Sequence, residues 1–154
     1  MDQELLLKNI KNKSLHYTKR IKKCYANFHF LTTTRYGYDR IDAIKQIPSN
    51  LVFYEQNKVK RLDTWVKQSK YAFVISPHGN GLDCHRTWEA LSLGCIPIMK
   101  KSKISTLFKD LPVLIIDDWR DISQELLDKT ILNFKEKQFN LRKLTLSYWT
   151  KQFI

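Results

Sequence analysis

Glycine, proline and cysteine are scarce in this chain, and each scarcity excludes a class of protein. Four glycines and four prolines among 154 residues are too few for a collagen-like or linker-type sequence. The three cysteines form no CxxC pair, which argues against a disulfide scaffold and favours a reducing compartment. We therefore expect a protein that folds without cross-links.

Long apolar runs are also missing. The first twenty residues, MDQELLLKNIKNKSLHYTKR, contain only three consecutive apolar residues and no small-residue cleavage site, so they match neither a signal peptide nor a membrane anchor. No other stretch approaches the roughly 18 apolar residues of a membrane span. We expect a protein without a membrane segment that is soluble and cytoplasmic.

Apolar side chains make up 43% of the chain and aromatic ones 12%, enough for the core of a single domain. The formal net charge is +12, and it is unevenly distributed. Residues 1–23 contain seven basic and two acidic side chains, whereas residues 71–117 contain five and four. The excess has three interpretations: a solvated basic surface, attraction to an anionic ligand such as a nucleotide diphosphate, or nucleic-acid binding. Nucleic acid ranks last, because the usual nucleic-acid-binding motifs are absent.

Short apolar segments alternate with segments of helical spacing. The pattern predicts a basic N-terminal helix over residues 2–22, and then strands over 24–31, 51–54, 71–76, 95–99 and 113–116. It predicts further helices over 39–47, 57–69, 84–93, 102–109, 121–137 and 139–151. The run YAFVIS, residues 71–76, does not alternate, which is typical of a central parallel strand buried on both faces.

Repeated strand–helix units predict an α/β fold with a Rossmann-like, doubly wound parallel sheet. We expect residues 1–22 to form the basic N-terminal helix and residues 23–154 a single Rossmann-like domain. Ligands of such sheets bind beyond the carboxyl ends of the strands. The loop after YAFVIS is therefore the first place to look for a site.

That loop and the helix after it read SPHGNGLDCHRTWEALSLGCIPIM, residues 76–99. Pro77, Gly79 and Gly81 favour a tight turn whose backbone can approach a ligand closely. Asp83 is the predicted N-cap of the helix. Helical spacing directs Cys84, Thr87, Trp88 and Leu91 toward the sheet, and His85, Arg86 and Glu89 to the other side. These three side chains near the positive end of a helix suit a diphosphate and a ribose diol.

Simpler interpretations of the same residues stay open. Arg86 and Glu89 could form only a surface ion pair, and the glycines could serve only the turn. Trp88 is expected in the core. A zinc site is not expected either, because the spacing of its possible ligands matches no common zinc motif: His78, Asp83, Cys84, His85 and Cys95. The acidic pair Asp117–Asp118 lacks the acid–x–acid spacing of a manganese motif. Cys84 and His85 point about 100° apart on a helix, which argues against a thiol nucleophile. We expect no metal site.

The order and spacing of residues 77–98 resemble the sugar-donor half of exostosin-type glycosyltransferases. The signature of that family approximates P-R-G-x-x-x-x-S-x-R-x-x-E-A-L-x-x-G-C-I-P-V, and here the chain reads P-H-G-N-G-L-D-C-H-R-T-W-E-A-L-S-L-G-C-I-P-I. Close matching covers about 25 residues, and weaker agreement in strand–helix order extends it to residues 23–117.

The resemblance implies one donor-binding domain of a GT-B-type enzyme, which has two Rossmann-like domains and needs no metal. By resemblance, Arg86 would neutralise the donor phosphates and Glu89 would bind the ribose. Arg35 or Arg40, after the first strand, could add a second phosphate contact. The nucleotide-sugar-binding residues expected on these grounds are Pro77, His78, Gly79, Asn80, Gly81, Asp83, His85, Arg86, Glu89 and Arg35.

Two departures from the family matter. His78 stands where many members carry an arginine, which would make the charge there depend on pH. The chain also contains no acceptor domain, where the resemblance would place the catalytic base, so an acceptor domain or partner chain would have to complete the site.

The sequence thus predicts the donor domain of an exostosin-like glycosyltransferase. It would bind a UDP-sugar, its substrate rather than a cofactor, for transfer to a hydroxyl of a carbohydrate or glycoprotein acceptor. The alternatives are a non-catalytic nucleotide-sugar-binding module or subunit and, after it, a basic nucleic-acid-binding protein.

Overall fold

Five parallel strands form a single sheet in the order β2-β1-β3-β4-β5. The structure, a computed structural model, describes residues 2–29 and 33–153. The strands are β1 (Ile21–Ala26), β2 (Val52–Tyr54), β3 (Tyr71–Ile75), β4 (Ile96–Lys100) and β5 (Leu114–Ile116). The predicted α/β class and doubly wound parallel sheet are therefore confirmed.

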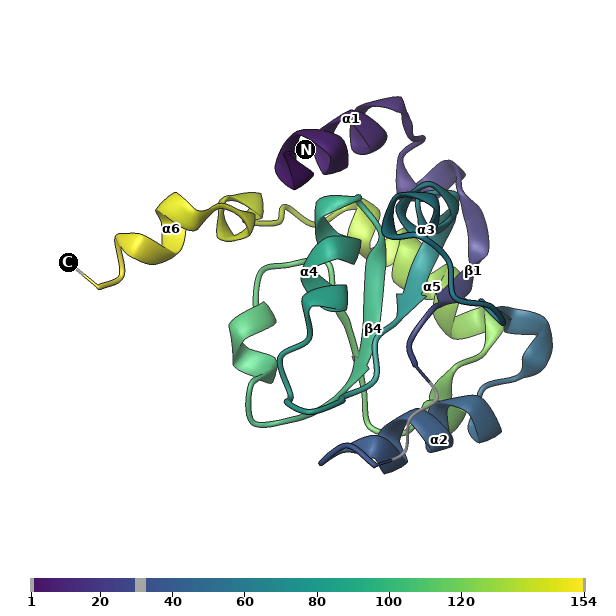
Figure 1. Cartoon of the computed structure of the whole chain (residues 1–154). Helices are drawn as coiled ribbons and strands as arrows, with labels where there is room; N and C mark the ends of the chain where they lie inside the picture. Colours follow the sequence, from purple (N-terminus) through teal and green to yellow (C-terminus); the bar gives the residue numbers. More distant parts are fainter. Residues whose placement is uncertain (1, 30–32, 154) are drawn as a thin grey trace.

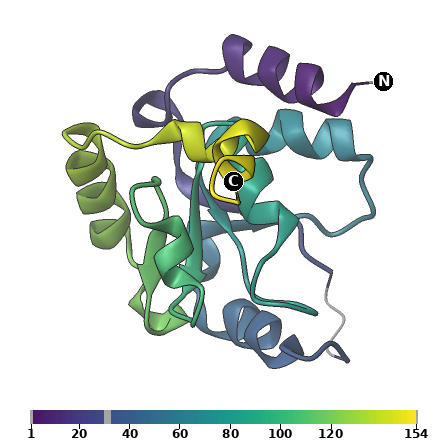
Figure 2. The same cartoon turned by 90° about the vertical axis from the view of Figure 1, so that its left-hand side faces the viewer.

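Helices cover both faces of this sheet (Figures 1 and 2). The α-helices are α1 (Gln3–Lys13), α2 (Gly37–Gln46), α3 (Arg61–Gln68), α4 (His85–Ser92), α5 (Gln124–Lys135) and α6 (Leu146–Thr150). Single 3₁₀ turns are η1 (Tyr17–Lys19), η2 (Ser49–Leu51), η3 (Ser105–Phe108), η4 (Trp119–Asp121) and η5 (Leu141–Leu144). No helix in the described ranges is long and apolar enough to cross a bilayer.

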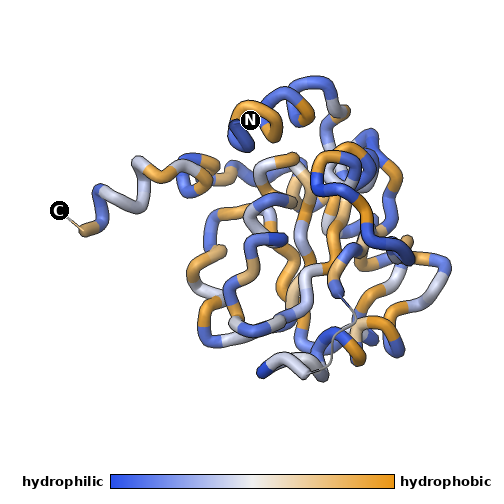
Figure 3. The backbone as a smooth tube through the Cα atoms, in the orientation of Figure 1, coloured by the Kyte–Doolittle hydropathy of each residue, from blue (hydrophilic) through white to orange (hydrophobic). Residues whose placement is uncertain are grey.

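The core has two main layers, one on each side of β3. On one side, Val74 of β3 packs with Trp65 of α3 and Ala90 of α4, and α1 covers these helices from outside with Leu6 and Ile10. On the other side, residues of α2, α5 and η4 pack against the alternate strand positions. Residues 72–76 are buried, as the non-alternating run predicts, and the tube in Figure 3 is mostly apolar along the strands.

Several predicted boundaries are wrong. The helix predicted over 2–22 ends at Lys13, because the backbone of Ser14 is extended and its hydroxyl donates to the Ile10 carbonyl at 2.6 Å. Residues 21–22 already belong to β1. The strand predicted over 24–31 leaves the sheet after Ala26, and residues 30–31 lie outside the described ranges. The helix predicted over 102–109 is only a 3₁₀ turn, and that over 139–151 is interrupted at Thr145.

A buried arginine supports the end of α4. Gly94 has a φ of 73°, the left-handed conformation that glycine adopts after a helix. Arg20, which directly precedes β1, donates to the carbonyls of Leu93 at 2.9 Å and Leu15 at 2.6 Å and to the Cys95 sulfur at 3.2 Å. Arg20 thereby connects the segment after α1 with the α4–β4 turn.

At the carboxyl edge of the sheet, the Asp39 carboxylate connects loops that follow several strands. One oxygen accepts the Trp119 indole N–H at 2.8 Å and lies 3.6 Å from the Lys100 ammonium; the other accepts the backbone N–H of His78 at 2.8 Å. Trp119 is fully buried. Asp39 therefore fixes α2 relative to the loop after β3, the end of β4 and η4.

We expect Asp39→Asn to lower the free energy of unfolding by about 2–4 kcal/mol, because one of the two N–H donors would face an amide NH₂ and lose its acceptor. Urea unfolding followed by circular dichroism measures this. The matched control is Asp63→Asn, at an exposed position in the first turn of α3. Equal losses in the two variants would contradict the assigned role of Asp39.

Candidate functional site

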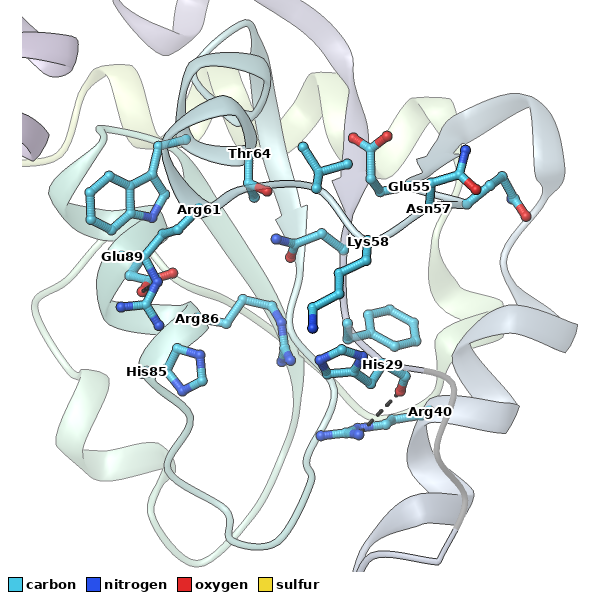
Figure 4. A pocket seen from close by; sticks show the side chains of 15 residues that line it. His29, Arg40, Glu55, Asn57, Lys58, Arg61, Thr64, His85, Arg86 and Glu89 are labelled. Carbon is cyan, nitrogen blue, oxygen red and sulfur yellow. Dashed lines mark hydrogen bonds and ion pairs between the residues drawn. The ribbon is translucent and has the colours of Figure 1, made fainter.

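The main candidate site is a pocket of about 470 Å³ at the carboxyl ends of β1 and β2. It lies where the connections from β1 and from β3 run to opposite sides of the sheet, the switch point at which ligands of such sheets bind. Its walls come from the segment after β1, from Arg40 of α2, from the loop after β2 and from the facing sides of α3 and α4. Figure 4 shows this pocket.

Basic side chains gather in the middle of the pocket. Figure 4 shows the nitrogen-bearing ends of Lys58, Arg86, Arg40 and His29 directed toward one another. The carboxylates lie at the two ends, with Glu89 beside Arg61 and Glu55 on the far side. Because basic side chains lie in the middle of the pocket and carboxylates lie only at its ends, the pocket suits a ligand with negative charge in its middle and hydroxyl groups at one end.

Arg86 is the most unusual of these cations, because its side chain is buried and the residue is only 8% exposed. Its guanidinium donates to the Pro77 carbonyl at 3.3 Å and lies 5.7 Å from the centre of the Phe28 ring. Burial lowers the pKa of Arg86, and the nearby positive charge of Arg40 lowers it further, against the opposing effects of Cys84 and Glu89. A buried guanidinium with so few acceptors is costly unless an anion completes its contacts.

Arg40 approaches this point from α2. It donates to the His29 carbonyl at 3.1 Å, while its Nε is buried without a hydrogen-bond partner in the described chain. Its guanidinium lies so close to Gly79 that a Cβ there would collide with the terminal nitrogen. Gly79 is therefore required for the close approach of Arg40 to the loop after β3.

The two carboxylates differ in how firmly they are held. Glu89 lies 3.8 Å from Arg61, a long ion pair, and Arg61 lies over the Trp65 ring at 5.9 Å. Glu55 accepts the Tyr25 hydroxyl at 2.9 Å and the Lys67 ammonium at 3.0 Å. Glu55 is held by two partners, whereas the weaker contact of Glu89 leaves its oxygens available to a ligand.

Of the residues predicted from sequence, the structure brings His85, Arg86 and Glu89 together in the pocket wall. The simpler interpretation, an ion pair between Arg86 and Glu89, is wrong, because Glu89 pairs with Arg61. Arg86 is buried rather than on an outward face.

The loop residues predicted to bind the ligand do not line this pocket: Pro77, His78, Gly79, Asn80, Gly81 and Asp83. Two of them instead position the arginines of the pocket. The Pro77 carbonyl accepts a hydrogen bond from Arg86, and the absence of a Cβ at Gly79 leaves space for the Arg40 guanidinium. His78 is buried with its Nδ1 at 3.3 Å from the Leu82 carbonyl. Asp83 is not the N-cap of α4, which is Cys84; its carboxylate instead accepts the Trp88 indole N–H at 2.8 Å.

Arg35 also lies away from the pocket. It is exposed and lies over the ring of Tyr36 at 5.5 Å, so Arg40 provides the guanidinium that the first loop contributes. Sequence reasoning missed His29, Lys58 and Arg61. These residues could have been suspected because they are polar and follow the first two strands closely, but that position indicates this pocket only once the strand order is known.

No group of three His, Cys, Asp or Glu side chains in the described residues has the arrangement of a metal site. Asp118, the second residue of the acidic pair Asp117–Asp118, binds the Arg120 guanidinium at 2.8 Å. Hydrogen bonds from Arg120 hold the pKa of this exposed carboxyl well below its usual range.

The three thiols differ in accessibility, and this gives a test of the site geometry. Burial raises the pKa of Cys24 strongly and that of Cys95 to about 11, so both stay protonated at pH 8. Cys84, half-buried at the N-cap of α4, contacts the carbonyls of Pro77 and Gly81.

We expect a colourless disulfide reagent that releases a chromophore to modify one thiol of the native protein at pH 8, and all three in denaturant. Cys84→Ser should remove the native reaction while leaving two thiols in denaturant. A second thiol that reacts equally fast in the native protein would contradict the packing of β1 and β4.

The comparisons with known proteins do not identify a family for this chain. No protein-family model matches the chain, and no curated protein matches its sequence. The basis for a functional proposal is therefore the pocket at the switch point, its buried cations and the resemblance of residues 77–98.

Proposed function

We propose that this chain is the nucleotide-sugar-binding domain of an exostosin-like glycosyltransferase and that a UDP-sugar occupies the pocket between α3 and α4. The diphosphate would lie against Arg86, Arg40 and the N-terminal end of α4. The ribose would lie against Glu89. The sugar would then be transferred to a hydroxyl of a carbohydrate or glycoprotein acceptor.

The convergence of Arg40 and Arg86 carries this proposal. Neither guanidinium pairs with a carboxylate in the described part of the chain, and the positive charge of Arg40 disfavours that of Arg86. A diphosphate would supply the missing negative charge and several acceptor oxygens, which planar guanidinium groups bind in a bidentate manner. The N-terminal turn of α4 adds favourable partial charge at the same place.

Size and position agree with this ligand. A pocket of about 470 Å³ falls within the usual range for small-molecule sites. Glu89 lies one turn of α4 beyond His85, so a nucleotide whose phosphates lie at the helix start can direct its ribose hydroxyls to the Glu89 carboxylate.

In the transfer reaction, negative charge grows on the departing diphosphate as its bond to the sugar breaks. Arg86 is held by Pro77 and buried before the ligand arrives, so its charge is already directed at that site and needs little reorganisation. Arg40, admitted by Gly79, would act in the same way. These residues stabilise the leaving group, and they supply no base for the acceptor.

Calorimetric titration with UDP in the presence of a chelator tests this proposal. We expect saturable binding of one UDP per chain, and a loss of about 1.5–3 kcal/mol of binding free energy in Glu89→Gln, because a hydrogen bond to a charged group is removed. Wild-type protein should discriminate against 2′-deoxy-UDP more strongly than Glu89→Gln does.

The matched control is Glu125→Gln, an exposed carboxylate in the first turn of α5. Binding that requires added Mn²⁺, or equal effects of the two substitutions, would contradict the proposed site. Steeply salt-dependent binding of DNA or RNA without a response to UDP would instead favour the nucleic-acid alternative.

A non-catalytic nucleotide-sugar-binding module is the second candidate, favoured by the state of the pocket carboxylates. Glu55 is held by Tyr25 and Lys67, and Glu89 is assigned to the ribose, so neither is poised to deprotonate an acceptor. In a two-domain enzyme the base and acceptor would come from the opposite side of the cleft.

We therefore expect residues 1–154 alone to bind donor but to transfer sugar negligibly, with at most slow hydrolysis to UDP and free sugar. A UDP-release assay with a panel of UDP-sugars, with and without sugar acceptors, measures both reactions. Robust acceptor-dependent turnover would show that this chain carries its own catalytic base.

A further inference from the structure

A second concave surface lies at the opposite edge of the sheet from the nucleotide pocket. It is a shallow groove of about 440 Å³ at the amino ends of β1 and β3, where the backbone N–H of Ile21 donates to the Lys70 carbonyl at 3.0 Å. We call it the lysine-rimmed groove, after the lysines and aliphatic residues that line it: Lys13, Lys19, Lys70, Leu15, Ile21 and Val66. In both views α1, beside this groove, lies at the end of the molecule opposite α2 (Figures 1 and 2).

The aliphatic side chains of the groove face solvent. Leu15 is 60% exposed, Ile21 48% and Val66 42%, although they come from three separate segments of the chain. Exposed apolar side chains that gather on one surface commonly mark an interaction site.

The charged side chains that line the groove, among the described residues, are all basic. Lys13, Lys19 and Lys70 are exposed and form no ion pair within the described residues, and no Asp or Glu of those residues lines the groove. Arg20, at the floor, donates to backbone carbonyls, so no carboxylate offsets its charge. The partner of this surface must therefore carry negative charge.

The neutral polar groups of the groove are already satisfied. The Ser14 hydroxyl donates to the Ile10 carbonyl at 2.6 Å, and the Ser69 hydroxyl donates to the Val66 carbonyl at 2.8 Å. Among the described residues, what remains is aliphatic surface ringed by lysines, without free hydroxyls to orient a small polar ligand and without aromatic rings for stacking bases.

We propose that the lysine-rimmed groove docks this protein on the surface of an anionic phospholipid bilayer. Leu15, Ile21 and Val66 would enter the boundary between headgroups and acyl chains, while the lysines extend to the phosphates and anionic headgroups. The nucleotide pocket, at the other edge of the sheet, would face away from the bilayer and stay open. This inference is independent of the ligand proposed for the pocket.

Co-sedimentation of the full chain with lipid vesicles tests the proposal. Vesicles of pure phosphatidylcholine are compared with vesicles in which a third of the lipid is phosphatidylserine. We expect binding to the anionic vesicles alone, and weaker binding as salt is added, because salt screens the attraction.

Two sets of variants separate charge from insertion. Replacing Lys13, Lys19 and Lys70 with Gln should weaken binding by about a hundredfold, since each lysine near an anionic surface contributes about fivefold. Leu15→Ser should weaken it by about tenfold through lost insertion. Matched controls are Gln at the exposed lysines 101, 103 and 109, and Leu146→Ser on α6, which is 78% exposed; these should bind like wild type.

Circular dichroism verifies that each variant is folded before its binding is compared. Absence of binding to anionic vesicles, equal binding to neutral ones, or equal losses in the controls would overturn the proposal. Full binding by Leu15→Ser together with loss in the lysine variant would also overturn it. That pattern would indicate attraction by charge alone, without insertion of the aliphatic side chains.

Discussion

The fold depends on one carboxylate at the carboxyl edge of the sheet. Asp39 lies in the first turn of α2 and accepts hydrogen bonds from the Trp119 indole and from the backbone of His78, with Lys100 close by. The groups that meet there come from the carboxyl end of β4 and from the segments after β1, β3 and β5, so they share no local contacts that could order them. A single partly buried acceptor with donors from several loops can fix their relative positions, because leaving any of those donors unpaired costs free energy.

The site uses the rigidity that Asp39 provides. Arg40 is the next residue on α2, so the same turn that fixes Asp39 also sets the path of the Arg40 side chain past Gly79. Arg86 is oriented from the other side by the Pro77 carbonyl. Two guanidinium groups near each other disfavour folding unless the surrounding packing holds them. The anionic ligand proposed for this pocket would relieve that repulsion.

The polarity of the parallel sheet separates two kinds of surface. All strands run in the same direction, so the loops that follow β1 and β2 meet at one edge of the sheet, where they line the candidate pocket. The opposite edge holds the lysine-rimmed groove, and Arg20 stabilises it from within by connecting the segment after α1 with the end of α4. A ligand at one edge and an anionic surface at the other could therefore be bound together without steric conflict.

The sequence alone determined the features that arise from local order. The apolar run of residues 71–76 identified the buried central strand, and the spacing of residues 85–89 placed imidazole, guanidinium and carboxylate on one helix. It did not determine which strands are neighbours, because that depends on how distant apolar faces pack. The side chains after β1 and β2 therefore come together in the pocket only in the folded chain.

The sequence also did not determine which of Arg35 and Arg40 enters the pocket, because the two are equivalent by position. The packing of α2 through Asp39 and the space left by Gly79 turn Arg40 inward and leave Arg35 on the surface, and contacts between residues so far apart in the chain exist only once the sheet has formed.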